Sequence, residues 1–231
     1  MSITLYELVG SDETRPFSPH CWKVRMALEL KGLSYECEPV RFTEIPTVAD
    51  GSARTLPVLR DGSRLIVDSF KIAEHLEEAY PERPTLFGDG AGRAYARFIE
   101  KWVLMELHPL ITRIAVREIH DLLDLPDQNY FRRTREMRLG ATLEDVTRSR
   151  DEARPKFASA LQPVRAVLDE QPFLGGAEPR FVDFILFGAL QWVRLVSTFP
   201  VLAKDDVVDI WFERCLDLYG SLGRSYPACE G

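Results

Sequence analysis

Residues 17–32 constrain the fold most, because this one segment carries the signals for both ends of a helix. Ser18 is a favoured N-cap residue, Pro19 suits the first helical position, and Gly32 suits the position after the last turn. The preceding residues 3–8 alternate apolar and polar side chains like a half-buried strand. The chain therefore opens with a strand and a well-delimited helix.

The first turn of that helix is a place where an anion is stabilised. Its unpaired N–H groups and the positive end of the helix dipole lie close to Ser18. A hydroxyl at Ser18 and a thiol at Cys21 stand one turn apart at this helix end. This combination indicates chemistry on a thiolate.

The first third of the chain predicts a mixed sheet covered by helices. Residues 35–40 read as a second strand, in which Pro39 favours an edge or a strand end. Residues 57–67 have the pattern of a hairpin around the turn Asp61-Gly62, and residues 69–80 read as a helix. We expect the first two strands to be parallel because a helix joins them, whereas the hairpin strands are antiparallel.

Residues 81–90 are dense in proline and glycine and read as a linker. Beyond them the hydrophobic pattern is helical, which predicts an all-helical second domain. We therefore expect one domain at residues 1–80, a linker at 81–92 and a second domain at 93–231. The expected helices cover residues 91–118, 129–139, 143–170, 181–196 and 205–218.

The charge balance argues against two classes of partner. A net charge of −7 gives no general attraction to nucleic acid or to anionic membranes. The basic run at residues 132–135 is followed by Glu136 and is typical of a solvated helix face. The longest apolar run, residues 181–196, contains Asp183 and falls short of the ~20 apolar residues of a membrane span. We expect neither nucleic acid nor a membrane as a partner.

The cysteines and histidines give no metal-site pattern. Four of each are present, without a CxxC pair or an HExxH spacing, so we expect no metal. The N-terminal residues lack the basic start and long apolar core of a secretory signal. The cysteines are therefore expected to be reduced thiols in a cytoplasmic protein.

Several motifs, taken in order, match a known family. Residues 18–28, 55–59 and 65–76 match its first domain, and residues 173–176 with Asp183 match its second. The chain resembles the cytosolic glutathione transferases over essentially its whole length. The resemblance implies an α/β thioredoxin-like N-terminal domain with a mixed four-stranded sheet, an all-α C-terminal domain, glutathione as cosubstrate, and a homodimer.

A narrower resemblance concerns three further segments. Residues 42–46, 120–128 and 139–146 look like segments of the bacterial β-aryl-etherase glutathione transferases, which act on lignin-derived aryl ethers. The related fungal class FuA shares much of this pattern. Subfamily membership does not fix the substrate, because function depends on the site rather than on the fold.

The resemblance implies that the Ser18 hydroxyl donates a hydrogen bond to the glutathione sulfur. A free thiol has a pKa of about 8.5, so only a few per cent is thiolate at neutral pH, and a hydrogen bond to the charged form favours it. The alternative role of Ser18 is to cap its helix. Cys21 is a possible secondary thiol, although buried cysteines usually behave as small apolar side chains.

The resemblance also implies how the rest of glutathione is held. Leu56-Pro57 matches a cis-proline loop whose backbone pairs with the cysteinyl part, as an added strand would. Ser69 with the helix N-terminus suits the γ-glutamyl carboxylate, and Asp68 suits the ammonium group. Both can equally serve as helix caps. Arg54 is a candidate for binding a glutathione carboxylate or an ordinary solvated loop residue.

Asp183 matches an acid that helps to start the central helix of the second domain. Many relatives place a hydroxyl three residues earlier, but Arg180 stands there and cannot accept a backbone hydrogen bond. We interpret Asp183 as structural.

The electrophile site is expected between the domains, facing Ser18. His108 is a candidate for orienting a ketone or phenol oxygen. Side chains at helical spacing are also commonly core residues, so each candidate has that alternative. The candidate pocket residues are Phe17, His20, Trp102, Met105, His108 and Ile111.

Together these features predict a glutathione transferase in which Ser18 stabilises the thiolate for attack on a small aromatic electrophile, such as a β-aryl ether. One alternative is disulfide exchange through Cys21, or a zeta-like isomerase suggested by the sequence Trp22-Lys23-Val24-Arg25. The other is a homologue that binds aromatic ligands without turnover.

Overall fold

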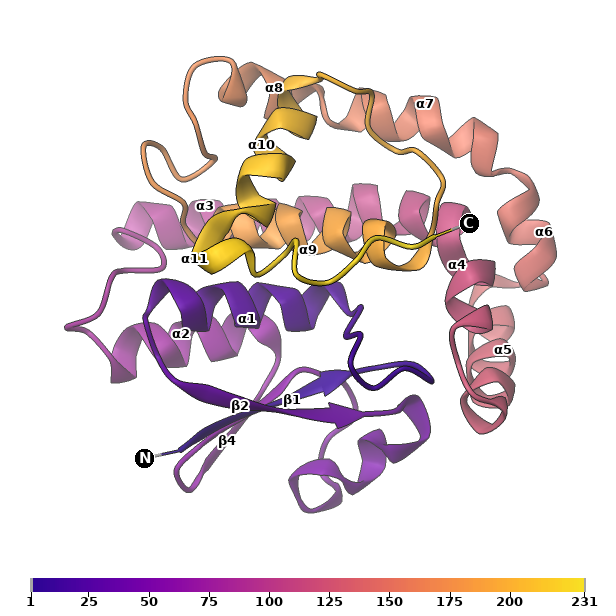
Figure 1. The fold of residues 1–231 in the computed structure, drawn as a ribbon, viewed down its shortest axis with the longest axis horizontal. Helices are drawn as coiled ribbons and strands as arrows, with labels where there is room; N and C mark the ends of the chain where they lie inside the picture. Colours follow the sequence, from indigo (N-terminus) through magenta and orange to yellow (C-terminus); the bar gives the residue numbers. More distant parts are fainter. Residues whose placement is uncertain (1, 231) are drawn as a thin grey trace.

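The computed structural model describes residues 2–230 and has a sheet layer and a helical layer (Figure 1). Helices α1 (Pro19–Leu30) and α2 (Ser69–Ala79) lie between the sheet and the helical layer. Helix α9 (Phe181–Val196) packs directly on α1. The boundary between the two layers is therefore a helix–helix contact.

The sheet has the mixed topology that the sequence predicts. Its order is β2-β1-β3-β4, with β1 parallel to β2 and antiparallel to β3, and β3 antiparallel to β4. Pro39 lies in the edge strand, where a residue without an N–H group is tolerated. The strands are β1 (Ile3–Leu8), β2 (Tyr35–Val40), β3 (Val58–Asp61) and β4 (Arg64–Val67).

Helix α1 has the predicted ends but is buried on both sides. Ser18 precedes it in an extended conformation, and Gly32 follows it with φ of 61°, a left-handed value that glycine adopts at little cost. Trp22, Val24 and Leu28 are all completely buried. The helix is covered by the sheet on one side and by α9 on the other, which fixes the position of its N-terminus.

The segment after β2 forms a 3-10 helix, η1 (Phe42–Gly51), where the sequence predicts no regular element. The buried Asp127 carboxylate accepts hydrogen bonds from the backbone N–H groups of Phe42 (2.7 Å) and Thr43 (2.9 Å). Asp127 belongs to α5 (Leu125–Leu139) in the helical layer. These two hydrogen bonds connect η1 to the helical layer.

The helical layer contains more breaks than the sequence predicts. The expected helix at residues 143–170 is three helices, broken near Ser149 and Leu161, and Pro163 lies in the first turn of the third. The remaining helices are α3 (Gly90–Trp102), α4 (His108–Asp121), α6 (Leu143–Arg148), α7 (Arg150–Ala160), α8 (Gln162–Leu168), α10 (Val207–Leu216) and α11 (Leu218–Ser221).

The expected helix at residues 91–118 is also interrupted, by a π-helical turn, η2 (Val103–Leu107), between α3 and α4. The N–H group of His108 donates to the Val103 carbonyl, five residues earlier. Pro109 follows and has no N–H group with which to continue an α-helical pattern. A π turn holds an extra residue, so the side chains after it face different directions from those of a continuous helix.

The structure confirms that Asp183 has a structural role. Its carboxylate is fully buried and accepts hydrogen bonds from the backbone N–H groups of Leu174, Gly175 and Arg180 and from the Trp211 indole, at 2.7–3.1 Å. The Arg180 guanidinium instead donates to the Thr85 carbonyl (2.7 Å). The hydrogen bonds to Asp183 therefore stabilise the start of α9, although Arg180 has no hydroxyl to cap it.

We expect the substitution Gly188→Ala to destabilise the protein by about 1–3 kcal/mol, because it overpacks the contact between α1 and α9. A Cβ atom at Gly188 would lie 2.4 Å from the Pro19 carbonyl oxygen. Gly90→Ala is the matched control, since a Cβ atom there meets nothing within 4 Å. Urea unfolding of both variants measures the difference, and equal stabilities would contradict the tight helix crossing.

Candidate active site

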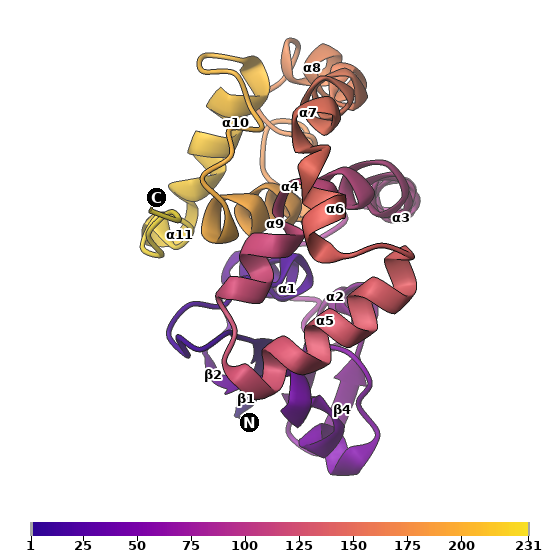
Figure 2. The same cartoon turned by 90° about the vertical axis from the view of Figure 1, so that its right-hand side faces the viewer.

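A cavity of about 890 Å³ lies between the two layers. Figure 2 shows α4 and α5 reaching from the helical layer alongside the sheet layer, and both helices contribute to the cavity wall. An apolar, aromatic wall with a few polar groups is typical of a site for a small organic ligand. The apolar part of the wall includes Phe17, Phe42, Ile45, Tyr130, Phe131 and Trp192.

Ser18 lies in the cavity wall at the N-terminus of α1. Its carbonyl accepts the first hydrogen bond of the helix, from the Trp22 N–H group (3.1 Å), but its side chain makes no capping hydrogen bond. The alternative role, in which the Ser18 hydroxyl serves only as a cap, is therefore not supported. The hydroxyl is available to a ligand in the cavity.

Cys21 is completely buried and is not among the residues that line the cavity. Burial raises the pKa of its thiol to about 12, and the nearby negative charge of Glu7 adds to this. A thiol with this pKa remains protonated at neutral pH, which disfavours Cys21 as a nucleophile.

The loop before β3 reaches the cavity through Arg54, Thr55 and Leu56. The Leu56–Pro57 peptide bond is cis, as the resemblance implies. Pro57 itself does not line the cavity, and the exposed Arg54 donates hydrogen bonds to the carbonyls of Gly51 (2.8 Å) and Ala53 (3.1 Å). The roles of Arg54, Leu56 and Pro57 toward glutathione stay predictions.

Asp68 and Ser69 lie at the start of α2, outside the wall of this cavity. The Asp68 carboxylate accepts from the N–H groups of Phe70 and Lys71, both at 3.0 Å, which confirms that it caps the helix. Its φ of 86° is in the left-handed region, an uncommon conformation for an aspartate. The binding roles of Asp68 and Ser69 stay predictions.

The structure places three of the six predicted pocket residues in the cavity wall and three elsewhere. Phe17, His20 and His108 line the cavity. Trp102, Met105 and Ile111 do not line it; the Met105 side chain points to solvent with 71% of its surface exposed, and Ile111 is in the core. The π turn is the physical reason for Met105, which lies in it, and for Ile111, which follows it, because the turn changes which side chains face the cavity; Trp102 precedes the turn, at the end of α3.

Several cavity residues were missed because they come from helices whose inward faces the sequence did not identify. Tyr130, Phe131 and Arg135 come from α5, and Trp192 comes from α9. The spacing of Phe131 and Arg135, four residues apart, places both on one face of α5. That spacing is a signal that could have found them.

Two buried polar side chains, Glu100 and Lys23, are linked to His20 in the cavity wall. The Lys23 ammonium is completely buried and lies 3.3 Å from a Glu100 oxygen and 3.1 Å from His20 Nδ1. An ammonium can only donate, so Nδ1 accepts and the ring proton is on Nε2. Burial, followed by the charges of Lys23 and His108, holds the pKa of His20 well below its usual value. His20 is therefore a neutral hydrogen-bond donor in the cavity wall.

His108 is also neutral, since burial lowers its pKa to about 3. Its ring centroid lies 5.4 Å from that of His20 and 5.4 Å from that of Trp192. His108 Nε2 is buried without a hydrogen-bond partner among the described residues. The histidine pair thus adds polar atoms to the cavity wall without adding charge.

Residues 2–230 contain no group of three or more side chains that could hold a metal ion. Within the same range, no helix combines the length and apolar character needed to cross a membrane.

Two family models match the chain. One described as "Glutathione S-transferase, N-terminal domain" matches residues 14–84, and one described as "Glutathione S-transferase, C-terminal domain" matches residues 94–217. The chain is 28% identical over 218 residues to the glutathione S-transferase-like protein ustS of Aspergillus flavus, covering 78% of this chain and 75% of that protein. It is 33% identical over 106 residues to a maleylacetoacetate isomerase of Pseudomonas aeruginosa, covering 40% of this chain and 48% of that protein.

Solved structures share the fold. Glutathione transferase GSTFuA3 from Phanerochaete chrysosporium superposes with a TM-score of 0.70 at 28% identity, covering 100% of this chain and 99% of that one. Glutathione S-transferase CsGST63524 of Ceriporiopsis subvermispora, solved in complex with glutathione, gives a TM-score of 0.77 at 24% identity, covering 99% of this chain and 98% of that one. Since the C-terminal family model alone spans more than half of the sequence, the chain belongs to the glutathione S-transferase family.

Proposed function

We propose that this glutathione transferase binds glutathione with its sulfur at Ser18 and directs the thiolate at an aromatic electrophile, in particular at the β-carbon of a β-aryl ether. One observation carries the proposal. The Ser18 hydroxyl lies in the wall of an aromatic cavity, at a helix N-terminus, and is not used to cap that helix. A hydroxyl placed in this way is a donor for an anion.

The expected contribution of Ser18 is to stabilise the thiolate relative to the thiol. A hydrogen bond to the charged sulfur and the end of α1 act in the same direction. A fall of ~2 units in the thiol pKa corresponds to ~2.7 kcal/mol of preferential stabilisation.

With an α-aryloxy ketone, the sulfur lone pair forms a C–S bond while the C–O bond breaks and its electrons leave with the phenolate. The thiol proton has left the sulfur before the attack, and the phenolate gains a proton from solvent. Neutral His20, with its ring proton on Nε2, can donate to the substrate carbonyl or to the departing oxygen. Binding glutathione and the electrophile next to each other supplies the remaining rate acceleration.

The domain arrangement in this proposal follows the sequence prediction. Glutathione lies on residues 1–80, with Leu56, Pro57, Asp68, Ser69 and Arg54 as its binding residues, and the electrophile lies between that domain and residues 93–231. A homodimeric state and a cytoplasmic location belong to the same proposal and rest on the family resemblance.

The test is an α-aryloxy ketone with a fluorescent phenol as leaving group. We expect phenol release that depends on glutathione, with an equal amount of glutathione thioether in the mass spectrum. Phenol release without the thioether would contradict the proposal. Glutathione binding with no turnover would favour a non-catalytic ligand binder, and glutathione-dependent isomerisation of a maleyl compound in place of thioether formation would favour an isomerase.

A further inference from the structure

Three arginines from the helical layer line the cavity without an acidic partner. Arg113 from α4 and Arg135 and Arg138 from α5 all line the cavity. None of the three forms an ion pair with any carboxylate in residues 2–230. Arg54, which the sequence prediction assigns to glutathione, also lines the cavity without an ion pair among the described residues, so four positive charges lack an acidic partner there in a chain with a net charge of −7.

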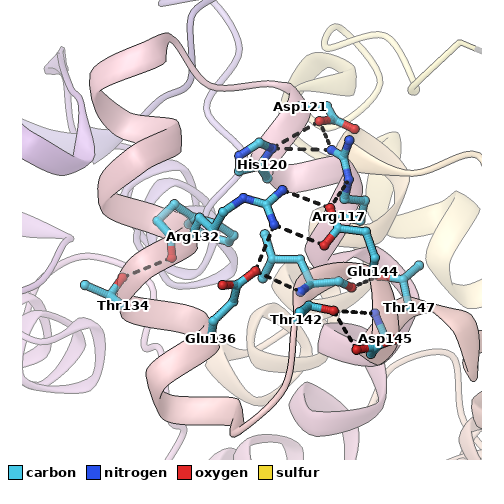
Figure 3. A network of polar contacts seen from close by, with 12 residues as sticks. Arg117, His120, Asp121, Arg132, Thr134, Glu136, Thr142, Glu144, Asp145 and Thr147 are labelled. Atoms are coloured by element: carbon cyan, nitrogen blue, oxygen red, sulfur yellow. Dashed lines mark hydrogen bonds and ion pairs between the residues drawn. The ribbon is translucent and has the colours of Figure 1, made fainter.

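One neighbouring arginine on each of these two helices is paired. Figure 3 shows Arg117 and Arg132 in a network where Arg132 binds Glu144 (2.9 Å) and Glu136 (2.8 Å), and Arg117 binds Glu144 (3.0 Å) and Asp121. Acidic residues are therefore placed beside the arginines of this network, and the arginines of the cavity are left without them.

The only acid in the cavity wall, among the described residues, is already engaged. Asp145 accepts a hydrogen bond from the Thr142 hydroxyl (2.8 Å) and forms an ion pair with Arg148 (2.9 Å). Its carboxylate is therefore not available to neutralise the three cavity arginines.

Arg135 is the most constrained of the three. Its guanidinium lies over the rings of Phe131 (4.7 Å to the centroid) and Phe42 (5.2 Å), and it donates to the Thr134 hydroxyl (2.9 Å). Burial, followed by the charge of Arg138, lowers its pKa. A partly buried guanidinium without a counter-charge is unfavourable, and a bound carboxylate would relieve this through two parallel hydrogen bonds.

We propose that Arg135, with Arg113 and Arg138 also in the cavity wall, binds a carboxylate carried by the aromatic electrophile. The aromatic ring of the ligand packs on the apolar wall, and the carboxylate meets the guanidinium of Arg135. This site selects carboxylated aromatic ligands over their neutral esters. As a statement about the substrate, it rests on the proposed transferase function; as a statement about binding, it can be tested without turnover.

The test is calorimetric binding, in the absence of glutathione, of the thioether 4-(phenacylthio)benzoate and of its methyl ester. We expect the wild-type protein to bind the acid at least about 10-fold more tightly than the ester, which corresponds to a hydrogen-bonded charged group. Arg135→Met should remove most of that preference by weakening acid binding much more than ester binding, because methionine keeps an apolar contact with Phe131. Arg133→Met, on the same helix and outside the cavity wall, is the matched control.

Equal affinities for acid and ester in the wild-type protein would overturn the proposal. An equal loss of both ligands in Arg135→Met and in Arg138→Gln would also overturn it, because that pattern indicates damage to the cavity. No thiol nucleophile is present in this titration, so ligand binding is measured without transfer. A preference for the acid in a protein that shows no transferase turnover would support the binding site and refute the proposed function.

Discussion

Replacing Ser18 with alanine is expected to slow glutathione transfer about 25-fold at pH 7, and the deficit should nearly vanish at about pH 9.5. The reason is the population of thiolate. If Ser18 lowers the sulfur pKa by ~2 units from about 8.5, most of the bound thiol is ionised at neutral pH, against a few per cent without the hydroxyl. Above both pKa values the sulfur is ionised in either protein, so the difference is lost.

The measurement is the pH dependence of thioether formation at saturating glutathione. Its control is Cys21→Ala, which should keep the wild-type profile because the Cys21 thiol, with a pKa of about 12, stays protonated throughout this range. Ser18→Ala should also unfold at nearly the wild-type urea concentration, since the side chain makes no capping hydrogen bond. A loss of rate that is equal at every pH would argue against thiolate stabilisation, and a loss confined to Cys21→Ala would favour disulfide exchange.

The substitution Asp183→Asn is expected to have the second large effect, a loss of stability. The carboxylate accepts four hydrogen bonds with both of its oxygens. An amide of the same shape turns one acceptor into a donor that faces other donors, so at least one buried N–H group loses its partner. We expect a loss of about 3 kcal/mol in the free energy of unfolding.

Urea denaturation followed by far-UV circular dichroism measures this loss. The matched control is Asp89→Asn at the N-cap of α3, where the carboxylate accepts from the Gly92 N–H group (2.8 Å) and the residue is exposed. Asparagine and aspartate are equally good N-caps, so that change should stay within about 0.5 kcal/mol. Similar losses in the two variants would mean that the buried hydrogen bonds of Asp183 contribute no more than an exposed cap.

The sheet and the position of Ser18 could be predicted because local signals determine them. The alternation of residues 3–8 and the Asp61-Gly62 turn are sufficient to define strands and a hairpin. The cap residues around α1 likewise predict where the helix begins, and therefore where the Ser18 hydroxyl lies. These features depend on neighbours in the sequence.

The register of the α3–α4 segment could not be predicted in this way. The π turn at Val103–Leu107 has no signal in the hydrophobic pattern beyond the nearby Pro109, and it changes the direction of every later side chain. Met105 was consequently expected in the pocket and is exposed. The hydrogen bond from Trp211 to Asp183 joins residues far apart in sequence, so local pattern reading could not reveal it either.

The link between Asp127 and the start of η1 has a consequence for redesign of the cavity. Phe42 belongs to the cavity wall, and its backbone N–H group is bound by a carboxylate from the other layer. A graft that exchanged α4 and α5 for the equivalent helices of a relative would therefore also need an acid at position 127. Without it, two backbone N–H groups at the start of η1 would lose their acceptor. The grafted helices would then face an η1 segment, including Phe42, that has moved from its present position.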